Sequence, residues 1–281
     1  MRIFRRLFVL LALLPLAPAL PRAGDAQVAV SITVAPPPLP VYVQPPLPGP
    51  GWIWAPGYWA WGPYGYYWVP GTWVRPPRVG LLWTPGYWGW ANGIYLWHAG
   101  YWGPHVGFYG GINYGFGYIG AGYFGGFWEH GAFHYNAAVN NFGGVHIANV
   151  YRQTTVNNIN IARAGAVTRV SFNGGQGGVA ARPTPQEEGF AREPHLAATA
   201  LQQRHATMAQ ANPALRFSAN HGRPAIAATA RPAAFGARGA QPHHPPPRGQ
   251  RAGAQARPHG GQQPHKAPPK GGGDHQRPEH D

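Results

Sequence analysis

Apolar, aromatic and small residues fill nearly every position between residues 52 and 103, and tryptophan recurs there at a fixed spacing. The pattern Trp-x-x-Gly-x-Trp occurs four times, and its copies begin 14, 15 and 14 residues apart, at Trp54, Trp68, Trp83 and Trp97. A short, constant period predicts an architecture made of one small repeated unit.

Turn residues between the copies predict that the chain folds back at each link. Asn92-Gly93 suits a type I′ hairpin turn, because both residues tolerate positive φ. Further loops are expected at Pro63-Tyr64 and around Arg78. One pairing rule then aligns every repeat tryptophan across the three links, as Trp54–Trp73, Trp59–Trp68, Trp83–Trp102, Trp88–Trp97, Trp73–Trp83 and Trp68–Trp88.

This register predicts a mainly β protein that begins with a four-stranded antiparallel meander, with strands near 52–61, 66–75, 81–91 and 94–103. The candidate binding residues are the eight repeat tryptophans, in two cross-strand rows: Trp54, Trp73, Trp83 and Trp102, and Trp59, Trp68, Trp88 and Trp97. Their rings have three alternative roles. They form the core of a sheet that has little else to bury, an aromatic platform for a carbohydrate, or a surface for a partner or for self-association.

The third and fourth positions of the motif are unusual for a strand. Three copies place Pro-Gly there, and the fourth has Ala99-Gly100. Proline cannot donate to a ladder and mid-strand glycine marks a bulge, so each strand is expected to bend at this point. The alternative makes each Pro-Gly a tight type II turn that pairs Trp54 with Trp59. The long-strand interpretation is favoured, because a type II turn splays a two-residue hairpin.

Residues 1–26 predict a secretory signal peptide. Three arginines precede the apolar run Leu7–Leu14, and small residues suit cleavage after Ala26, with Ala23 as the alternative. Prolines interrupt an apolar run that is already too short to span a bilayer, which disfavours a retained anchor. We therefore expect export to the periplasm or cell surface, with no transmembrane span after the signal is removed.

Composition divides the remaining chain into segments. We predict an N-terminal strand and Pro-rich extended linker (27–51), a Gly/Asn/aromatic-rich β region (104–181), short helices (182–232) and a disordered basic tail (233–281). In the β region, Val150–Ile161 and Val167–Phe172 are the strand candidates. Thr184 and Glu187 form a capping box for one helix, which should end by Glu193, and a second helix is expected over Leu196–Ala211.

Charge is distributed unevenly. The net charge is +14, yet between Trp52 and Asn160 only Arg75, Arg78, Glu129 and Arg152 are charged. This asymmetry predicts an ordered aromatic half and a solvated basic half. Expected export argues against a nucleic-acid partner, so the basic tail is expected to meet anionic cell-envelope polymers or lipid head groups, with a generic solubilising role as the alternative. The partners expected for the chain as a whole are cell-envelope polymers or glycans, or a second copy of itself. Cysteine is absent, which excludes a disulfide framework and a thiolate metal site.

Candidate chemistry is sparse. No nucleophile elbow or phosphate loop occurs, and pairing Glu129 with Glu187 or Glu188 has no spacing argument behind it, so we predict no catalytic residues and no cofactor. His130 and His134 would align as metal ligands only on a helix, which the neighbouring glycines disfavour, and further histidines lie in the tail. We therefore predict no metal site.

The segment Tyr67-Trp68-Val69-Pro70-Gly71-Thr72-Trp73 resembles the bacterial YXWGXW (WXXGXW) repeat family. The resemblance continues in later blocks, which include Asn141–His146, Val170–Gly174, Ala181–Glu188 and Asn220–Ala225, and covers roughly residues 27–232. It implies an exported protein of unassigned biochemistry and transfers no site residues. The predicted function is an exported, non-catalytic structural or interaction protein of the bacterial cell envelope. The alternative is a carbohydrate- or cell-wall-binding module that uses exposed tryptophan rows.

Overall fold

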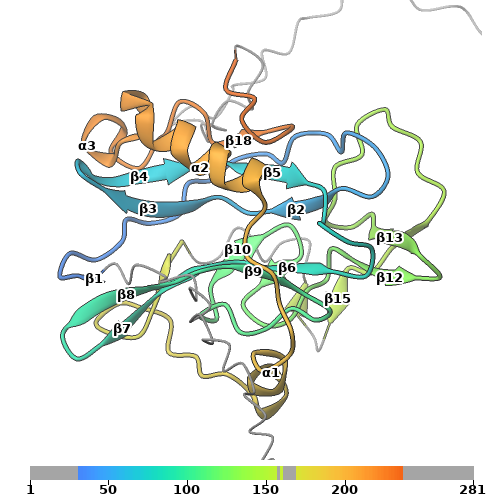
Figure 1. Cartoon of the computed structure of the whole chain (residues 1–281), viewed down its shortest axis with the longest axis horizontal. Coiled ribbons are helices and arrows are strands. Elements are labelled where there is room, and N and C mark those ends of the chain that lie inside the picture. Colours follow the sequence, from blue (N-terminus) through green and yellow to red (C-terminus); the bar gives the residue numbers. More distant parts are fainter. Residues whose placement is uncertain (1–30, 157–158, 161–168, 237–281) are drawn as a thin grey trace, which may run out of the picture. The chain divides into compact units, whose positions relative to one another are not determined.

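Two bent antiparallel hairpins form the centre of the fold (Figure 1). The computed structural model describes residues 31–156, 159–160 and 169–236. The first hairpin consists of β2 (Ile53–Ala55), β3 (Tyr58–Gly62), β4 (Gly65–Val69) and β5 (Gly71–Val74). The second consists of β6 (Leu82–Thr84), β7 (Tyr87–Ala91), β8 (Ile94–His98) and β9 (Tyr101–Gly103).

The predicted register within each hairpin is confirmed. The cross-strand partners are Trp54–Trp73, Trp59–Trp68, Trp83–Trp102 and Trp88–Trp97. Asn92 and Gly93 have φ values of 51° and 85°, as a primed turn requires. Each motif's Pro-Gly or Ala-Gly pair interrupts the strand without shifting the register. The long-strand interpretation is therefore correct, and the tight-turn alternative is not.

The pairing predicted across the Arg78 link is wrong. The outer edge of β5 pairs in parallel with β18 (Ala228–Thr229), and that of β7 pairs in parallel with β17 (Phe172–Asn173). Pro76 and Pro77 follow β5 and have no N–H to extend a ladder. The second hairpin therefore packs against the first as a layer instead of extending one meander (Figure 1).

Contacts between the two layers are aromatic. Tyr58 of the first hairpin stacks on Trp97 of the second, with 5.0 Å between the ring centroids. The indole Nε1 of Trp88 donates to the Trp59 carbonyl oxygen at 2.8 Å. Aromatic pairs of this kind contribute roughly 0.5–1.5 kcal/mol beyond the burial of their surface. The mainly β, tryptophan-paired fold class is thus confirmed, with two packed layers in place of the pairing predicted across the Arg78 link.

The Pro-rich segment before the repeats packs against them. Strand β1 (Ser31–Ile32) pairs with β8, within the predicted N-terminal strand, and residues 27–30 lie outside the described part. Downstream, Leu39, Gln44 and Leu47 are buried. Proline carbonyls in this segment accept hydrogen bonds although the residues cannot donate them. The segment is therefore part of the core's hydrogen-bonding shell and not a free linker.

The region after the repeats contains short strands: β10 (Asn113–Gly115), β11 (Tyr118–Ile119), β12 (Gly126–Glu129), β13 (Ala132–Asn136), β14 (Val150–Tyr151), β15 (Thr155–Val156) and β16 (Ile159–Asn160). The single strand predicted over Val150–Ile161 is wrong. β14 pairs in parallel with β13, whereas β15 pairs antiparallel with β16. The Asn136 side chain accepts from the Gln153 N–H at 3.0 Å, which diverts that backbone group from a ladder. Of the candidate Val167–Phe172, residues 167 and 168 lie outside the described part, and a strand begins only at Phe172.

The first two helices begin at capping boxes. α1 (Pro185–Phe190) has the predicted capping box of Thr184 and Glu187. α2 (Ala200–Ala211) begins four residues later than predicted, because Thr199 caps it through a second box with Gln202. The 3₁₀ helix η2 (Pro213–Leu215) and α3 (Phe217–Asn220) follow.

Among the helices of the described residues, none has both the length and the apolar character needed to cross a bilayer. All of these residues belong to one unit, Met1–His243. The predicted signal peptide at 1–26 lies outside the described residues, as does the predicted tail at 233–281 beyond residue 236. The start of that tail is described, and there Ala233 and Phe235 contact His205.

Candidate functional site

The motif glycines lie beneath the indoles of the opposite strand. A Cβ at any of them would collide with the first tryptophan of the partner copy, in the pairs Gly57 with Trp68, Gly71 with Trp54, Gly86 with Trp97 and Gly100 with Trp83. The same first tryptophan also contacts the last tryptophan of the partner copy, with ring centroids 5.2–5.3 Å apart. Each Trp-x-x-Gly-x-Trp copy is therefore half of a reciprocal unit that needs glycine at its fourth position.

The indole N–H groups connect the hairpins to distant segments. Five of them donate to internal oxygens at 2.8–3.1 Å: Trp59 to Pro38, Trp68 to Ala227, Trp73 to Pro45, Trp88 to Trp59 and Trp102 to the Gln202 side chain. The Nε1 of Trp54 is buried without an acceptor in the described part of the chain. The repeat tryptophans are thus both the core and the hydrogen-bonding anchors of the fold.

Burial decides whether the predicted rows are a surface. Seven of the eight tryptophans are at most 8% exposed, namely Trp54, Trp59, Trp68, Trp73, Trp83, Trp88 and Trp102. Trp97 alone is half-buried. Of the three alternative roles for these rows, the seven buried tryptophans have that of the core, because they meet each other across strands and between layers.

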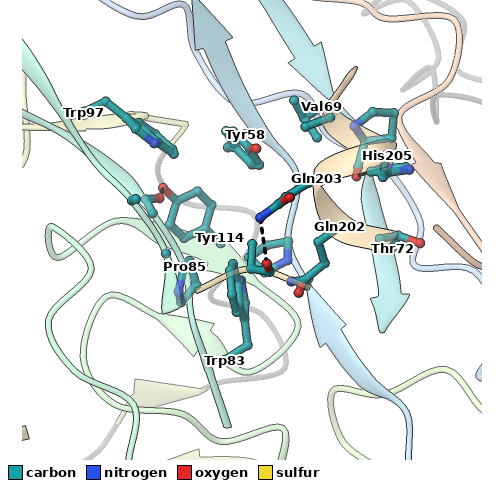
Figure 2. A pocket seen from close by; sticks show the side chains of 18 residues that line it. Tyr58, Val69, Thr72, Trp83, Pro85, Trp97, Tyr114, Gln202, Gln203 and His205 are labelled. Carbon is teal, nitrogen blue, oxygen red and sulfur yellow. Dashed lines mark hydrogen bonds between the residues drawn. The ribbon is translucent and has the colours of Figure 1, made fainter. Parts of the chain in front are cut away.

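A cavity of about 180 Å³ lies where the bends of all four copies converge (Figure 2). The residue before each motif glycine lines it: Pro56, Pro70, Pro85 and Ala99. Four aromatic rings complete most of the wall, from Tyr58, Trp83, Trp97 and Tyr114. The lining is mainly apolar, and an apolar cavity of this size has room for one small ring.

Helix α2 and the residues before it close the cavity on one side. The backbones of Leu196 and Trp102 exchange two hydrogen bonds of 2.8 Å, which fixes this segment to β9. The chain then passes to α2, which packs against β4 (Figure 1). Gln203 lines the cavity, and its Nε2 donates to the Ala198 carbonyl at 3.0 Å (Figure 2). One segment thus spans both hairpins at the cavity.

His205 is the buried histidine of this wall. Its Nδ1 accepts from the Ala233 N–H at 2.9 Å, so its Nε2 carries the proton and donates to the Pro70 carbonyl at 2.8 Å. Burial lowers the pKa of His205 to about 4, and the bond to Pro70 raises it in part. The side chain is therefore a neutral structural connector at neutral pH, and both of its ring nitrogens are occupied.

A groove of about 550 Å³ lies on the other side of Ala99-Gly100 and shares Trp97 with the cavity. Its aromatic walls are Tyr87, Trp97, Tyr101 and Phe108. Tyr87 stacks on His98 with a centroid separation of 4.4 Å, and burial raises the pKa of Tyr87. The exposed Glu188 adds a carboxylate, whereas Glu187 is buried in its capping box. Aromatic faces beside a carboxylate form the mixture of apolar and polar groups that small-molecule sites use.

Two matches to a family model coincide with the two hairpins. The sequence model of the WXXGXW repeat family matches residues 49–74 and 78–102. The chain therefore contains two WXXGXW repeats. No curated protein and no solved structure matches the chain. One WXXGXW repeat of the family model therefore corresponds to one bent hairpin with two motif copies.

The other sequence candidates lie apart from the WXXGXW repeats. Glu129 and His134 face each other across the β12–β13 hairpin, with 3.5 Å between Oε2 and Nε2, and His130 occupies its turn with φ of 47°. Within the described residues, no group of three or more histidine, aspartate or glutamate side chains could hold a metal ion. Glu187 caps α1, so it is not available to pair with Glu129.

Sequence reasoning missed the residues that close the cavity. Gln202 and His205 lie in a segment expected only to be helical, and nothing in its composition indicates that it crosses two WXXGXW repeats. The pattern Thr199-x-x-Gln202 was a usable signal for the start of α2. Tyr58 occupies the fifth motif position, as Tyr87 and Tyr101 do, so its spacing did not single it out, and Tyr114 lies outside the motif copies.

Proposed function

We propose that this chain is an exported, non-catalytic structural or interaction protein of the bacterial cell envelope. The observation that carries the proposal is that the repeat tryptophans form the core of the fold and its internal hydrogen bonds. Seven repeat tryptophans are buried, and five indole N–H groups bind oxygens inside the fold. Buried and hydrogen-bonded side chains of this kind stabilise the fold and its surface, and they are not free to act on a substrate.

Export is supported by the basic and apolar pattern of residues 1–26. The test is fractionation of a Gram-negative host that expresses the full chain, followed by mass spectrometry of the mature N-terminus. We expect a periplasmic or surface-associated chain that begins at Gln27. A variant with Arg2, Arg5 and Arg6 replaced by glutamate should remain unprocessed in the cytoplasm. Recovery of the intact wild-type N-terminus from the cytoplasm would contradict the proposal.

Carbohydrate binding is the second candidate, and the groove favours it. The partner would be a cell-envelope glycan whose sugar faces pack on Trp97 and Tyr101 while Glu188 accepts hydroxyl hydrogen bonds. This differs from the sequence-based hypothesis in its residues, because only Trp97 of the eight tryptophans takes part.

A cosedimentation assay with insoluble peptidoglycan tests this candidate. Tyr101→Ala should reduce binding by about tenfold, which corresponds to the ~1.4 kcal/mol expected for one lost aromatic contact. Tyr64→Ala is the matched control, because Tyr64 is 66% exposed at the turn of the first hairpin, outside the groove. Equal binding by the wild type and both variants would show that the groove is not the peptidoglycan-binding site.

A further inference from the structure

The two hairpins present corresponding sets of motif residues. Each set consists of the two first tryptophans and the two glycines that they cover. The corresponding residues are Trp54 and Trp83, Gly57 and Gly86, Trp68 and Trp97, and Gly71 and Gly100. Both hairpins have the same internal register. A side chain that packs against this set in one hairpin therefore indicates which chemical group would fit against the corresponding set in the other.

Tyr42 occupies the set of the first hairpin. Its ring centroid lies 6.4 Å from that of Trp54 and 6.2 Å from that of Trp68. The Gly57 N–H donates to the Tyr42 hydroxyl at 3.4 Å, and a Cβ at Gly71 would lie 2.9 Å from the same oxygen. A phenol thus reaches between two indoles, with its hydroxyl over the paired glycines.

The corresponding residues of the second hairpin border open space. Trp83, Trp97, Gly86 and Gly100 all line the cavity of about 180 Å³. The tyrosines nearby form its wall and do not take the place that Tyr42 has in the first hairpin. Tyr58 stacks on Trp97. The Tyr114 hydroxyl donates to the Gly86 carbonyl at 2.8 Å, whereas the Tyr42 hydroxyl accepts from the Gly57 N–H. The Gly86 backbone N–H corresponds to the Gly57 N–H that binds Tyr42.

We propose that this cavity is a binding site for a small phenol, a single aromatic ring that carries a hydroxyl group. The ring lies between Trp83 and Trp97, and its hydroxyl oxygen accepts from the Gly86 N–H, as Tyr42 does in the first hairpin. The volume fits the class, since an apolar cavity of about 150 Å³ accepts benzene and sites for drug-sized ligands begin near 300 Å³.

Calorimetric titration of the full chain with p-cresol, the side-chain analogue of tyrosine, tests the proposal. We expect saturable binding of one p-cresol per chain. Toluene has the same ring without the hydroxyl and should bind at least fivefold more weakly, and cyclohexanol should bind more weakly still. Absence of saturable p-cresol binding up to its solubility limit, or equal binding of all three compounds, would overturn the assignment.

Two neighbouring positions on α2 locate the binding. Ala206 lines the cavity, whereas Thr207 is exposed and does not. Ala206→Phe should fill the cavity and weaken p-cresol binding at least tenfold, and Thr207→Phe should leave it unchanged. If Ala206→Phe fails to fold, ¹⁹F NMR of the wild type labelled with 5-fluorotryptophan gives the same answer. The Trp83 and Trp97 resonances should shift on titration, and shifts confined to other tryptophans would place the ligand elsewhere.

The occupied set provides an independent test. Tyr42→Ala should open the same site in the first hairpin, so this variant should bind two p-cresol molecules and recover part of its lost thermal stability as p-cresol is added. Recovery without a second binding event, or no recovery, would show that the two sets are not equivalent and would remove the basis of the proposal.

Discussion

Gly71 lies beneath the indole of Trp54, so close that a Cβ would stand 2.6 Å from Trp54 Cζ2. Its backbone pairs with Ala228 on the other side, which leaves little room for the strand to move. We expect Gly71→Ala to lower the free energy of unfolding by about 3 kcal/mol, at the upper end of the cost of inserting a methyl group into a packed core. Urea denaturation followed by tryptophan fluorescence measures the change.

Gly144 is the control for this substitution. Nothing lies within 4 Å of a Cβ placed there, and its φ lies outside the left-handed region. Gly144→Ala should therefore change the free energy of unfolding by less than about 0.5 kcal/mol. A similar loss for both variants would mean that the cost at Gly71 is general to glycine replacement and does not come from the indole.

Trp54 and Trp68 occupy the same motif position but differ in their N–H groups. Trp68 Nε1 donates to the Ala227 carbonyl at 2.9 Å, whereas Trp54 Nε1 is buried without an acceptor in the described part of the chain. Trp68→Phe should therefore cost about 1 kcal/mol more than Trp54→Phe, because it also removes a buried hydrogen bond to the Ala227 carbonyl, which keeps only the 3.3 Å bond from the Gly71 N–H. Paired urea melts of the two variants measure the difference. A larger loss for Trp54→Phe would contradict this assignment of the hydrogen bonds.

Local chemistry explains which parts of the fold could be predicted. Asn92-Gly93 sets its turn within two residues, and the pairing of Trp88 with Trp97 follows from it. The failure at the Arg78 link has a physical cause that lies far along the chain. The edge of β5 is occupied by Ala228, and the Trp68 indole bonds to a carbonyl 159 residues away. No short-range pattern contains that information.

The candidate site shows the same limit. The eight tryptophans were identified by their spacing, but their burial depends on the packing of one hairpin on the other, as in the stacking of Tyr58 on Trp97. Periodicity specifies which residues pair within a hairpin and does not specify which face another layer covers. The cavity wall from α2 was therefore beyond the reach of the repeat pattern.

Gln202 joins the start of α2 to the second hairpin. Its Oε1 accepts from Trp102 Nε1 at 2.8 Å and from the Thr199 backbone N–H at 2.9 Å. Gln202→Leu removes the acceptor and should cost about 2–4 kcal/mol, because a buried indole N–H and a helix cap are lost together. Gln202→Glu retains an acceptor oxygen and should cost less than about 1 kcal/mol at pH 7. Chemical denaturation of both variants measures this order, and equal losses would contradict it.

His205 should make stability depend on pH in mildly acidic solution. Burial lowers the pKa of His205 to about 4, below the ordinary value of 6.5, so the unfolded chain binds the proton more readily than the folded chain. Its contribution to the free energy of unfolding is fully present above pH 6.5 and is lost as the pH falls toward 4, at up to about 1.4 kcal/mol per pH unit.

His205→Gln keeps a neutral side chain and should flatten this part of the pH profile of stability. His146→Gln, at an exposed histidine, should follow the wild type. Because carboxylates also titrate in this window, the informative quantity is the difference between the His205→Gln and wild-type unfolding free energies from pH 7.5 to pH 4. A constant difference over that range would show that His205 is not the group whose protonation destabilises the fold.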